Sequence, residues 1–323
     1  MGKKIIVIGL GSMGKRRIRL LRELDGSNEI TGVDSRANRR DEMAEKYGVK
    51  CVADLSEIVE SMDCAFVCTP PQTHGEIIRE CLERGWHVFS EINLIANLYD
   101  ENIRLAKEKG KVLFLSSTPI YRAEMRFITE RVRQIGKPCV YQYHVGQYLP
   151  DWHPWDNLKD FFVSSRATNG CREFLAIELP WMQRAFGRIT NMSVVKKELT
   201  SLNLGFPDTY LIQAEHEGGC VGNLLIDIVS RQAVRCLEVM NEKLYIKWNG
   251  TPESLYEKDI ITGELKQMQI GEYVHEQGYA DNINEVSYLE EINEFFDVIG
   301  GKKPVYGFEE DREILKCIDK IES

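Results

Sequence analysis

Three glycines stand between a short apolar run and a helical pattern near the start of the chain. Residues 4–8 read Lys-Ile-Ile-Val-Ile, which is typical of a strand buried on both faces of a parallel sheet. Gly9, Gly11 and Gly14 follow as G-x-G-x-x-G, and a helical pattern runs over residues 12–24. Such glycines allow a tight turn, close approach to a pyrophosphate and close helix–strand packing. This order predicts a dinucleotide-binding loop made of Gly9, Leu10, Gly11, Ser12, Met13 and Gly14.

An acidic residue ends the second predicted strand. Asp34 lies about 20 residues after the last glycine, where a carboxylate accepts hydrogen bonds from the adenine ribose and favours NAD over NADP. The alternative is that Asp34 caps the helix that starts at Ala37. NADP remains possible, because arginines follow that can meet a 2′-phosphate. We expect the cofactor to contact Ser35 and Arg36, with Arg39 and Arg40 nearby.

Strand and helix patterns alternate through the first third of the chain. Alternation at this spacing indicates right-handed βαβ units and a parallel sheet. The fold class is therefore α/β, with an N-terminal Rossmann, doubly wound parallel sheet over residues 1–118. Strands are expected at residues 4–8, 29–34, 65–68, 86–89 and 112–115, and helices at 12–24, 37–47, 73–84 and 98–109.

The pattern changes after residue 118. Residues 119–323 predict an α+β domain with an open, mostly antiparallel sheet, and Glu217-Gly218-Gly219 predicts a hairpin turn. The closing helices, within residues 286–323, are expected to pack back toward the first domain. Strands are expected at residues 140–147, 192–197, 210–215, 220–229, 233–239 and 243–248, and helices at 121–134, 172–186, 286–299 and 308–321.

The charge balance excludes some partners. A net charge of −9 argues against binding to nucleic acid or to an anionic membrane. The basic cluster Lys15, Arg16, Arg17 and Arg19 is interpreted as helix surface that also attracts an anionic cofactor.

The cysteines indicate a reducing compartment. The nine cysteines are scattered and form no CxxC pair, which predicts free thiols in a cytoplasmic protein and no metal site. No apolar run approaches the roughly 20 residues of a membrane helix. We also expect no signal peptide, because a strand begins within a few residues of the start.

Three further segments resemble the Gfo/Idh/MocA oxidoreductases, the family of glucose–fructose oxidoreductase and inositol dehydrogenase. Residues 67–74, with Thr69-Pro70-Pro71 and His74, are similar to its T-P-P motif followed by histidine. Residues 90–93 stand at its E-K-P motif, and residues 288–304 resemble its closing helix and glycine–proline exit.

The resemblance implies an NAD(P)-dependent enzyme that oxidises or reduces a sugar, a cyclitol or a sugar nucleotide. It places Thr69 and Pro70 beside the nicotinamide ribose, His74 near the cofactor and Glu91 on that ribose. Independently of the family, His74 could be a helix cap or a packed core residue, and Glu91 a loop carboxylate.

The sequence departs from the family at the residues that transfer protons. The E-K-P lysine is replaced by Ile92 and its proline by Asn93, an amide that can polarise a substrate but cannot titrate. The family's D-x-x-x-H pair aligns with Glu173 and Ile177, and Glu178 stands one residue further on.

The helix that carries these acids offers two readings. Glu173 and Glu178 interrupt an apolar helix, and buried carboxylates are costly unless they are paired or used. They are either acid/base candidates or ion-pair partners of Arg172 and Arg184. Pro180 predicts that this helix starts late or kinks.

An aromatic segment completes the candidate substrate site. Residues 148–156 combine aromatic faces with polar groups, as sugar pockets do, although they could also fasten a loop to the sheet. His153 is a candidate base. Candidate substrate-binding residues are Trp152, Trp155, Arg166 and Arg172. The arginines could bind an anionic group of the substrate or could simply be surface charges.

These patterns leave three functions open. The first is a hydride-transferring oxidoreductase with Asn93, His153, Glu173 and Glu178 as catalytic candidates. The second is a nucleotide-binding sensor or partner subunit without hydride chemistry. The third is an isomerase or lyase that recycles a tightly bound NAD. An open sheet face also predicts a homodimer or homotetramer.

Overall fold

The computed structural model describes residues 2–152, 161–276 and 283–323, and it divides the chain into two compact units. The first unit comprises Met1–Ser117 and Tyr288–Glu313. The second comprises Thr118–Ser287 and Ile314–Ser323. The boundary after Ser117 lies one residue from the position expected from the sequence, and the C-terminal segment is shared between the units.

The first unit is built on a parallel sheet of six strands in the order β3-β2-β1-β4-β5-β6. The chain passes from β1 outward to β2 and β3 and then crosses back to β4 on the other side of β1, so the topological switch point lies between β1 and β4. This is the doubly wound α/β sheet predicted from the sequence. Its strands are β1 Lys4–Ile8, β2 Glu29–Val33, β3 Lys50–Val52, β4 Cys64–Val67, β5 His87–Ser90 and β6 Leu113–Leu115.

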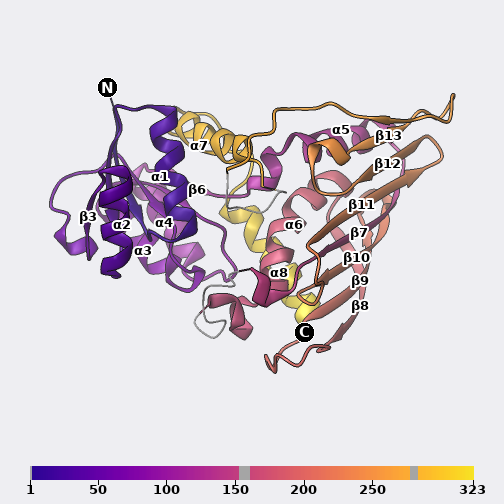
Figure 1. The fold of residues 1–323 in the computed structure, drawn as a ribbon, viewed down its shortest axis with the longest axis horizontal. Coiled ribbons are helices and arrows are strands. Elements are labelled where there is room, and N and C mark those ends of the chain that lie inside the picture. The colour runs from indigo at the N-terminus through magenta and orange to yellow at the C-terminus, as the bar shows by residue number, and fades with distance from the viewer. Residues whose placement is uncertain (1, 153–160, 277–282) are drawn as a thin grey trace. The chain divides into compact units, whose positions relative to one another are not determined.

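Helices follow the strands of this sheet (Figure 1). Gly48 and Gly110 end two of them with positive φ angles of 57° and 62°, as expected of glycine stops. Phe295, from the C-terminal segment of this unit, packs against Phe66 and Phe89 of the sheet with ring centroids 5.4 and 5.6 Å away. The helices are α1 Ser12–Leu24, α2 Ala37–Tyr47, α3 His74–Glu83, α4 Tyr99–Lys109 and most of α7 Glu285–Ile299. The helix α8 Phe308–Glu322 begins in this unit, and its residues from Ile314 onward belong to the second unit.

The second unit is built on an eight-stranded sheet in the order β14-β13-β12-β11-β7-β10-β9-β8. Neighbouring strands are antiparallel except for β7 and β10, which run parallel. The predicted hairpin is confirmed, with Gly218 and Gly219 at positive φ between β9 and β10. The strands are β7 Val140–Gly146, β8 Ile189–Lys197, β9 Thr209–His216, β10 Val221–Asp227, β11 Val234–Asn241, β12 Leu244–Trp248, β13 Tyr256–Lys258 and β14 Leu265–Gln267.

Two helices, α5 Ala123–Ile135 and α6 Gly170–Phe186, lie along one face of this sheet (Figure 1). The late start predicted for α6 is wrong. The helix begins at Gly170, where the Asn169 side chain accepts a hydrogen bond from the backbone N–H of Arg172 at 2.8 Å, and it continues through Pro180. Tertiary burial of this helix outweighs the one backbone hydrogen bond that proline removes.

Candidate active site

Each glycine of the loop before α1 has its own steric reason. A Cβ atom on Gly9, whose φ is 92°, would lie 2.7 Å from the Cys68 carbonyl group, and one on Gly14 would lie 1.9 Å from the Gly9 oxygen. A Cβ on Gly11 would meet nothing closer than the Arg39 guanidinium, at 3.5 Å. Gly9 and Gly14 are therefore required by packing, whereas Gly11 keeps the backbone open to a ligand.

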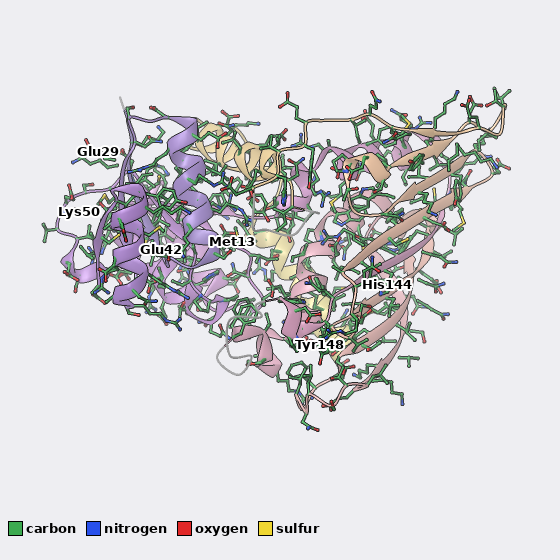
Figure 2. The ribbon with its side chains drawn as sticks, in the orientation of Figure 1. Met13, Glu29, Glu42, Lys50, His144 and Tyr148 are labelled. Atoms are coloured by element: carbon green, nitrogen blue, oxygen red, sulfur yellow. The ribbon has the colours of Figure 1, made fainter. Side chains whose placement is uncertain are left out.

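The start of α1 suits a phosphate group. The helix begins at Ser12 without a side-chain cap and without an acidic residue in its first turn. Its first N–H groups and the positive end of its dipole therefore remain available to an anion. Met13 lies at this end of the helix (Figure 2). The loop fits the pyrophosphate of a dinucleotide.

Asp34 joins the end of β2 to this loop. Its Oδ2 atom accepts a hydrogen bond from the Leu10 N–H at 2.8 Å and lies 3.3 Å from the Arg39 guanidinium. Its Oδ1 atom accepts from the Arg36 N–H at 2.9 Å, at the start of α2, so Asp34 also supports that helix. The side chains of Ser35 and Arg36 are exposed beside it.

His74 is fixed between two polar groups at the start of α3. Its ring nitrogens lie 2.6 Å from Asn93 Oδ1 and 2.7 Å from the Thr69 carbonyl oxygen. Burial lowers the pKa of His74, which is 2% exposed. Asn93 is buried too, so the structure directs its amide oxygen at His74. Thr69 is half-buried and Pro70 exposed in the same loop.

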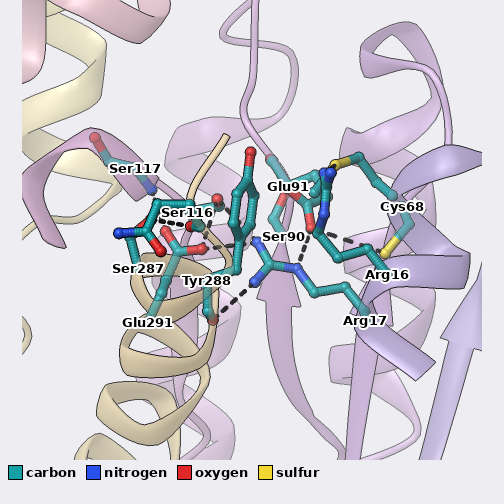
Figure 3. Close-up of polar contacts among 12 residues, drawn as sticks. Arg16, Arg17, Cys68, Ser90, Glu91, Ser116, Ser117, Ser287, Tyr288 and Glu291 are labelled. Carbon is teal, nitrogen blue, oxygen red and sulfur yellow. Dashed lines mark hydrogen bonds and ion pairs between the residues drawn. The ribbon is translucent and has the colours of Figure 1, made fainter. Parts of the chain in front are cut away.

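The interpretation of Arg16 and Arg17 as helix surface is wrong. Arg17 is fully buried and Arg16 nearly so. Arg17 donates to Glu91 Oε1 at 2.6 Å and to Glu291 Oε2 at 2.7 Å (Figure 3). Burial and the charge of Glu91 raise the pKa of Glu291, and Arg17 opposes them. The sequence did contain a signal, because Arg17 shares the helical face of Gly14 and Leu21.

The two acids of α6 differ sharply in their surroundings. Glu178 is fully buried and accepts from Tyr143, Trp181 and Arg235 at 2.6, 2.7 and 2.6 Å. Its ion-pair partner is Arg235 of β11, so the pairing expected with Arg172 or Arg184 is wrong. A distant strand, and not the helix itself, supplies the counter-charge.

One carboxylate oxygen of Glu173 is enclosed and has no partner among the described residues. Its Oε2 atom is shielded from solvent and accepts no hydrogen bond from the described residues. Burial raises the pKa of Glu173 to about 7. A carboxyl group of this kind can give and take a proton near neutral pH. The Ile177 side chain is half-buried one turn further along α6.

The predicted substrate residues are only partly described. The ring centroids of Trp152 and of Phe174, the residue after Glu173 in the sequence, lie 4.8 Å apart. Arg166 is exposed. Arg172 is buried and pairs with Asp319 at 2.7 Å and with Glu322, which ties α6 to α8 and not to a free ligand site. His153 and Trp155 lie outside the described residues.

The helix-free face of the second sheet has a shallow hollow of about 610 Å³. A polar row crosses it, with Gln142 of β7 beside Asn223 of β10 and Asn223 beside Gln213 of β9. These side-chain amides have no hydrogen-bond partner within the part of the chain that the structure describes. His144 lines the same hollow (Figure 2). Apolar residues flank the row, and their exposed fractions are 41% for Val140, 52% for Val195, 50% for Leu211 and 42% for Val221.

Other kinds of site were sought in the same residues. The described ranges hold no group of three or more His, Cys, Asp or Glu side chains suited to a metal ion. All nine cysteines are free thiols. Among the described helices, none combines the length and apolar character that crossing a membrane requires.

Comparison with known proteins relates residues 3–117 to an oxidoreductase family with an NAD-binding Rossmann fold, Gfo/Idh/MocA. Myo-inositol 2-dehydrogenase of Thermotoga maritima is 33% identical over 42% of this chain and 43% of its own length. A 4-carboxy-2-hydroxymuconate-6-semialdehyde dehydrogenase of Sphingobium is 28% identical over 45% of this chain and 48% of its own length. The aligned part thus spans less than half the length of either relative.

Solved structures extend the similarity of fold over nearly the whole chain. A probable dehydrogenase from Thermotoga maritima has a TM-score of 0.74 at 22% identity, covering 97% of this chain and 93% of that one. UDP-N-acetylglucosamine 3-dehydrogenase from Acidithiobacillus ferrooxidans has a TM-score of 0.75 at 16% identity, covering 100% and 97%. At these identities the likeness concerns the fold alone.

Proposed function

We propose that the protein is an NAD-dependent dehydrogenase or reductase of a sugar, cyclitol or sugar nucleotide, because residues 3–117 match the Gfo/Idh/MocA oxidoreductase family. Bound NAD would accept a hydride from the substrate, and bound NADH would donate one. The name of one relative supports the substrate class, since that relative is a dehydrogenase of myo-inositol. The open space at Gly11 and the uncapped start of α1 support the cofactor.

Residues of the first unit hold the cofactor in this proposal. The loop from Gly9 to Gly14 binds the pyrophosphate, and Asp34 binds the adenine ribose. Thr69, Pro70 and Glu91 contact the nicotinamide half. His74 and Asn93 act indirectly, because their mutual contact fixes the loop that carries Thr69. NADP is the second cofactor to test, since Arg39 and Arg40 surround Asp34.

The state of the Glu173 carboxyl group is the main support for proton transfer in this proposal. Its unpaired oxygen and a pKa of about 7 match what a general acid/base needs. During oxidation Glu173 accepts the proton of the substrate hydroxyl, and during reduction it returns that proton to the alkoxide. Glu178 is not suited to proton transfer, because its carboxylate already accepts hydrogen bonds from three donors. Glu178 therefore holds α6 against the sheet.

The surroundings of Glu173 suit a carbohydrate ring. Trp152 and Phe174 provide an aromatic surface on which a sugar can stack. Exposed Arg166 can meet a phosphate or carboxylate of the substrate. His153 and Trp155 remain candidates for base and stacking residue. A titratable buried acid favours an enzyme over a sensor that only binds the nucleotide.

Turnover measurements test this function. Purified protein is mixed with NAD or NADP and a panel of inositols, free sugars and UDP-sugars, and the absorbance of the reduced cofactor is followed. The proposal expects turnover with one member, and Glu173→Gln should lower kcat at least tenfold. Glu130→Gln, at an exposed residue of α5, is the matched control. Cofactor binding without turnover of any substrate would favour the sensor.

We further propose that the helix-free face of the second sheet pairs with a second copy of this chain. The unpartnered amides of Gln142, Asn223 and Gln213 can bond across such an interface, and the flanking apolar residues supply area to bury. A stable interface needs roughly 800 Å² from each partner. The nine free thiols fit a reducing, cytoplasmic location, which we propose as well.

A further inference from the structure

One guanidinium in the first unit is shared between two buried carboxylates. The Arg17 side chain is 0% exposed, and it lies 2.6 Å from Glu91 and 2.7 Å from Glu291 (Figure 3). Charges so deeply buried are costly unless their partners are held in place. The three side chains therefore form a fixed assembly, here called the Arg17 cluster.

The cluster lies at the edge of the sheet where a dinucleotide binds. Glu91 directly follows β5, and β1, β4 and β5 are neighbours in the sheet. Their carboxyl ends meet at one edge, which also carries the glycine loop after β1. The Glu91 side chain is 8% exposed, and its Oε2 atom accepts no hydrogen bond from the described residues. One carboxylate oxygen is thus held by Arg17 and the other is free for a ligand.

Glu291 fixes the opposite side of Arg17. It accepts hydrogen bonds from Ser117 N–H at 2.6 Å and from the Ser116 hydroxyl at 3.1 Å. The Tyr288 carbonyl oxygen, one turn earlier in α7, accepts from Arg17 at 3.3 Å. Arg17 also stacks on Phe89, 4.5 Å from the ring centroid. The guanidinium consequently has one position and cannot turn fully toward Glu91.

We propose that Arg17 and Glu291 are positioning residues for the cofactor: they hold Glu91 so that its free oxygen meets the ribose on the nicotinamide side of NAD. This inference rests on the proposed function. It makes α7, more than 170 residues beyond the Rossmann strands in sequence, a part of the cofactor site. Without Glu291, Arg17 turns a second nitrogen toward Glu91 and draws the carboxylate away from the ligand.

Calorimetric titration with NAD and with ADP tests the inference. ADP shares the adenosine and the pyrophosphate but lacks the nicotinamide half. Glu291→Gln keeps the size of the side chain and removes its charge. This variant should lower the affinity for NAD about tenfold and change the affinity for ADP less than about twofold. Lys107→Met is the matched control, because Lys107 also pairs with the C-terminal segment of this unit, at Glu309, but with 72% of its side chain exposed.

A double-mutant cycle separates positioning from general stability. If Glu291 acts through Glu91, adding Glu291→Gln to Glu91→Gln should cost little further NAD affinity. Arg17→Met should show the same split between NAD and ADP, although it leaves two carboxylates uncompensated and endangers folding. Equal losses of NAD affinity and ADP affinity in the variants, or additive losses of NAD affinity in the cycle, would overturn the inference. Binding of NAD by the wild-type protein would still support the proposed function in that case. Wild-type protein that binds ADP but not NAD would overturn both.

Discussion

Asp34 Oδ2 accepts a hydrogen bond from the backbone N–H of Leu10 at 2.8 Å. The acid that is expected to bind the adenine ribose therefore also fixes the loop that is expected to bind the pyrophosphate. Arg39 lies beside both, 3.3 Å from Asp34 and against Gly11. One carboxylate therefore couples the two segments that we propose as the site for the adenine ribose and the pyrophosphate.

Replacing this carboxylate should impair NAD binding more than NADP binding. Asp34→Ala removes the acceptor for the ribose hydroxyls and leaves the arginines to meet a 2′-phosphate. We expect NAD affinity to fall at least tenfold and the ratio of NADP to NAD affinity to rise, both measured by calorimetry. Asp41→Ala, at an exposed residue of α2, is the control. An unchanged ratio would contradict the role of Asp34.

Substitutions at two glycines of the loop should affect different properties, stability in one case and NAD binding in the other. Gly14→Ala places a methyl group 1.9 Å from the Gly9 oxygen, so the melting temperature should fall by several degrees. Gly11→Ala has room in the protein, so the fold should persist while NAD affinity drops at least tenfold. Thermal melts with and without NAD report both effects. A Gly11→Ala variant that binds NAD normally would argue against this loop as the pyrophosphate site.

Glu173 should make stability depend on pH. Its folded pKa of about 7 lies above the ordinary 4.5, so the folded state binds the proton more tightly. Its stabilising contribution is full below pH 4.5 and is lost as pH rises toward 7. The loss is at most roughly 3.5 kcal/mol, at about 1.4 kcal/mol per pKa unit. Denaturant unfolding at pH 5 and pH 8 should show Glu173→Gln stabilising the protein at the higher pH only.

Glu178 should matter for stability and not for proton transfer. Glu178→Ala leaves Arg235 buried without its counter-charge and Tyr143 without its acceptor. The free energy of unfolding should fall by about 3–5 kcal/mol. Adding Arg235→Met removes the orphaned charge and should recover part of the loss, as urea unfolding would reveal. A Glu178→Ala protein of normal stability and lost activity would instead assign Glu178 to catalysis.

The sheet face should control oligomeric state. Leu211→Lys introduces a charge among the apolar residues beside the polar row and should dissociate a dimer. Light scattering after gel filtration should give twice the chain mass for wild type and the chain mass for the variant. Val59→Lys, at a residue that is 96% exposed in the first unit, is the control. A wild-type monomer at micromolar concentration would contradict the proposal.

Local patterns were enough to predict much of the fold. Continuous apolar runs marked β1 and β4, and glycine stops marked the ends of α2 and α4, because these signals depend on neighbours in the sequence. The three-residue strands β3, β13 and β14 were not predicted, because such short segments carry little periodicity, whereas the equally short β6 was predicted. Pro180 was given too much weight, because packing of α6 overrides a local propensity.

The sequence by itself determined the Rossmann domain, the glycine loop and the acid at Asp34, since each follows from residue types at fixed short spacing. Only the tertiary structure decided the ionic partners. It paired Glu178 with Arg235, gave Glu173 no counter-charge within residues 2–152, 161–276 and 283–323, and buried Arg17 between Glu91 and Glu291. The physical reason is that burial and pairing set the state of a charge, and both depend on residues that are distant in the chain.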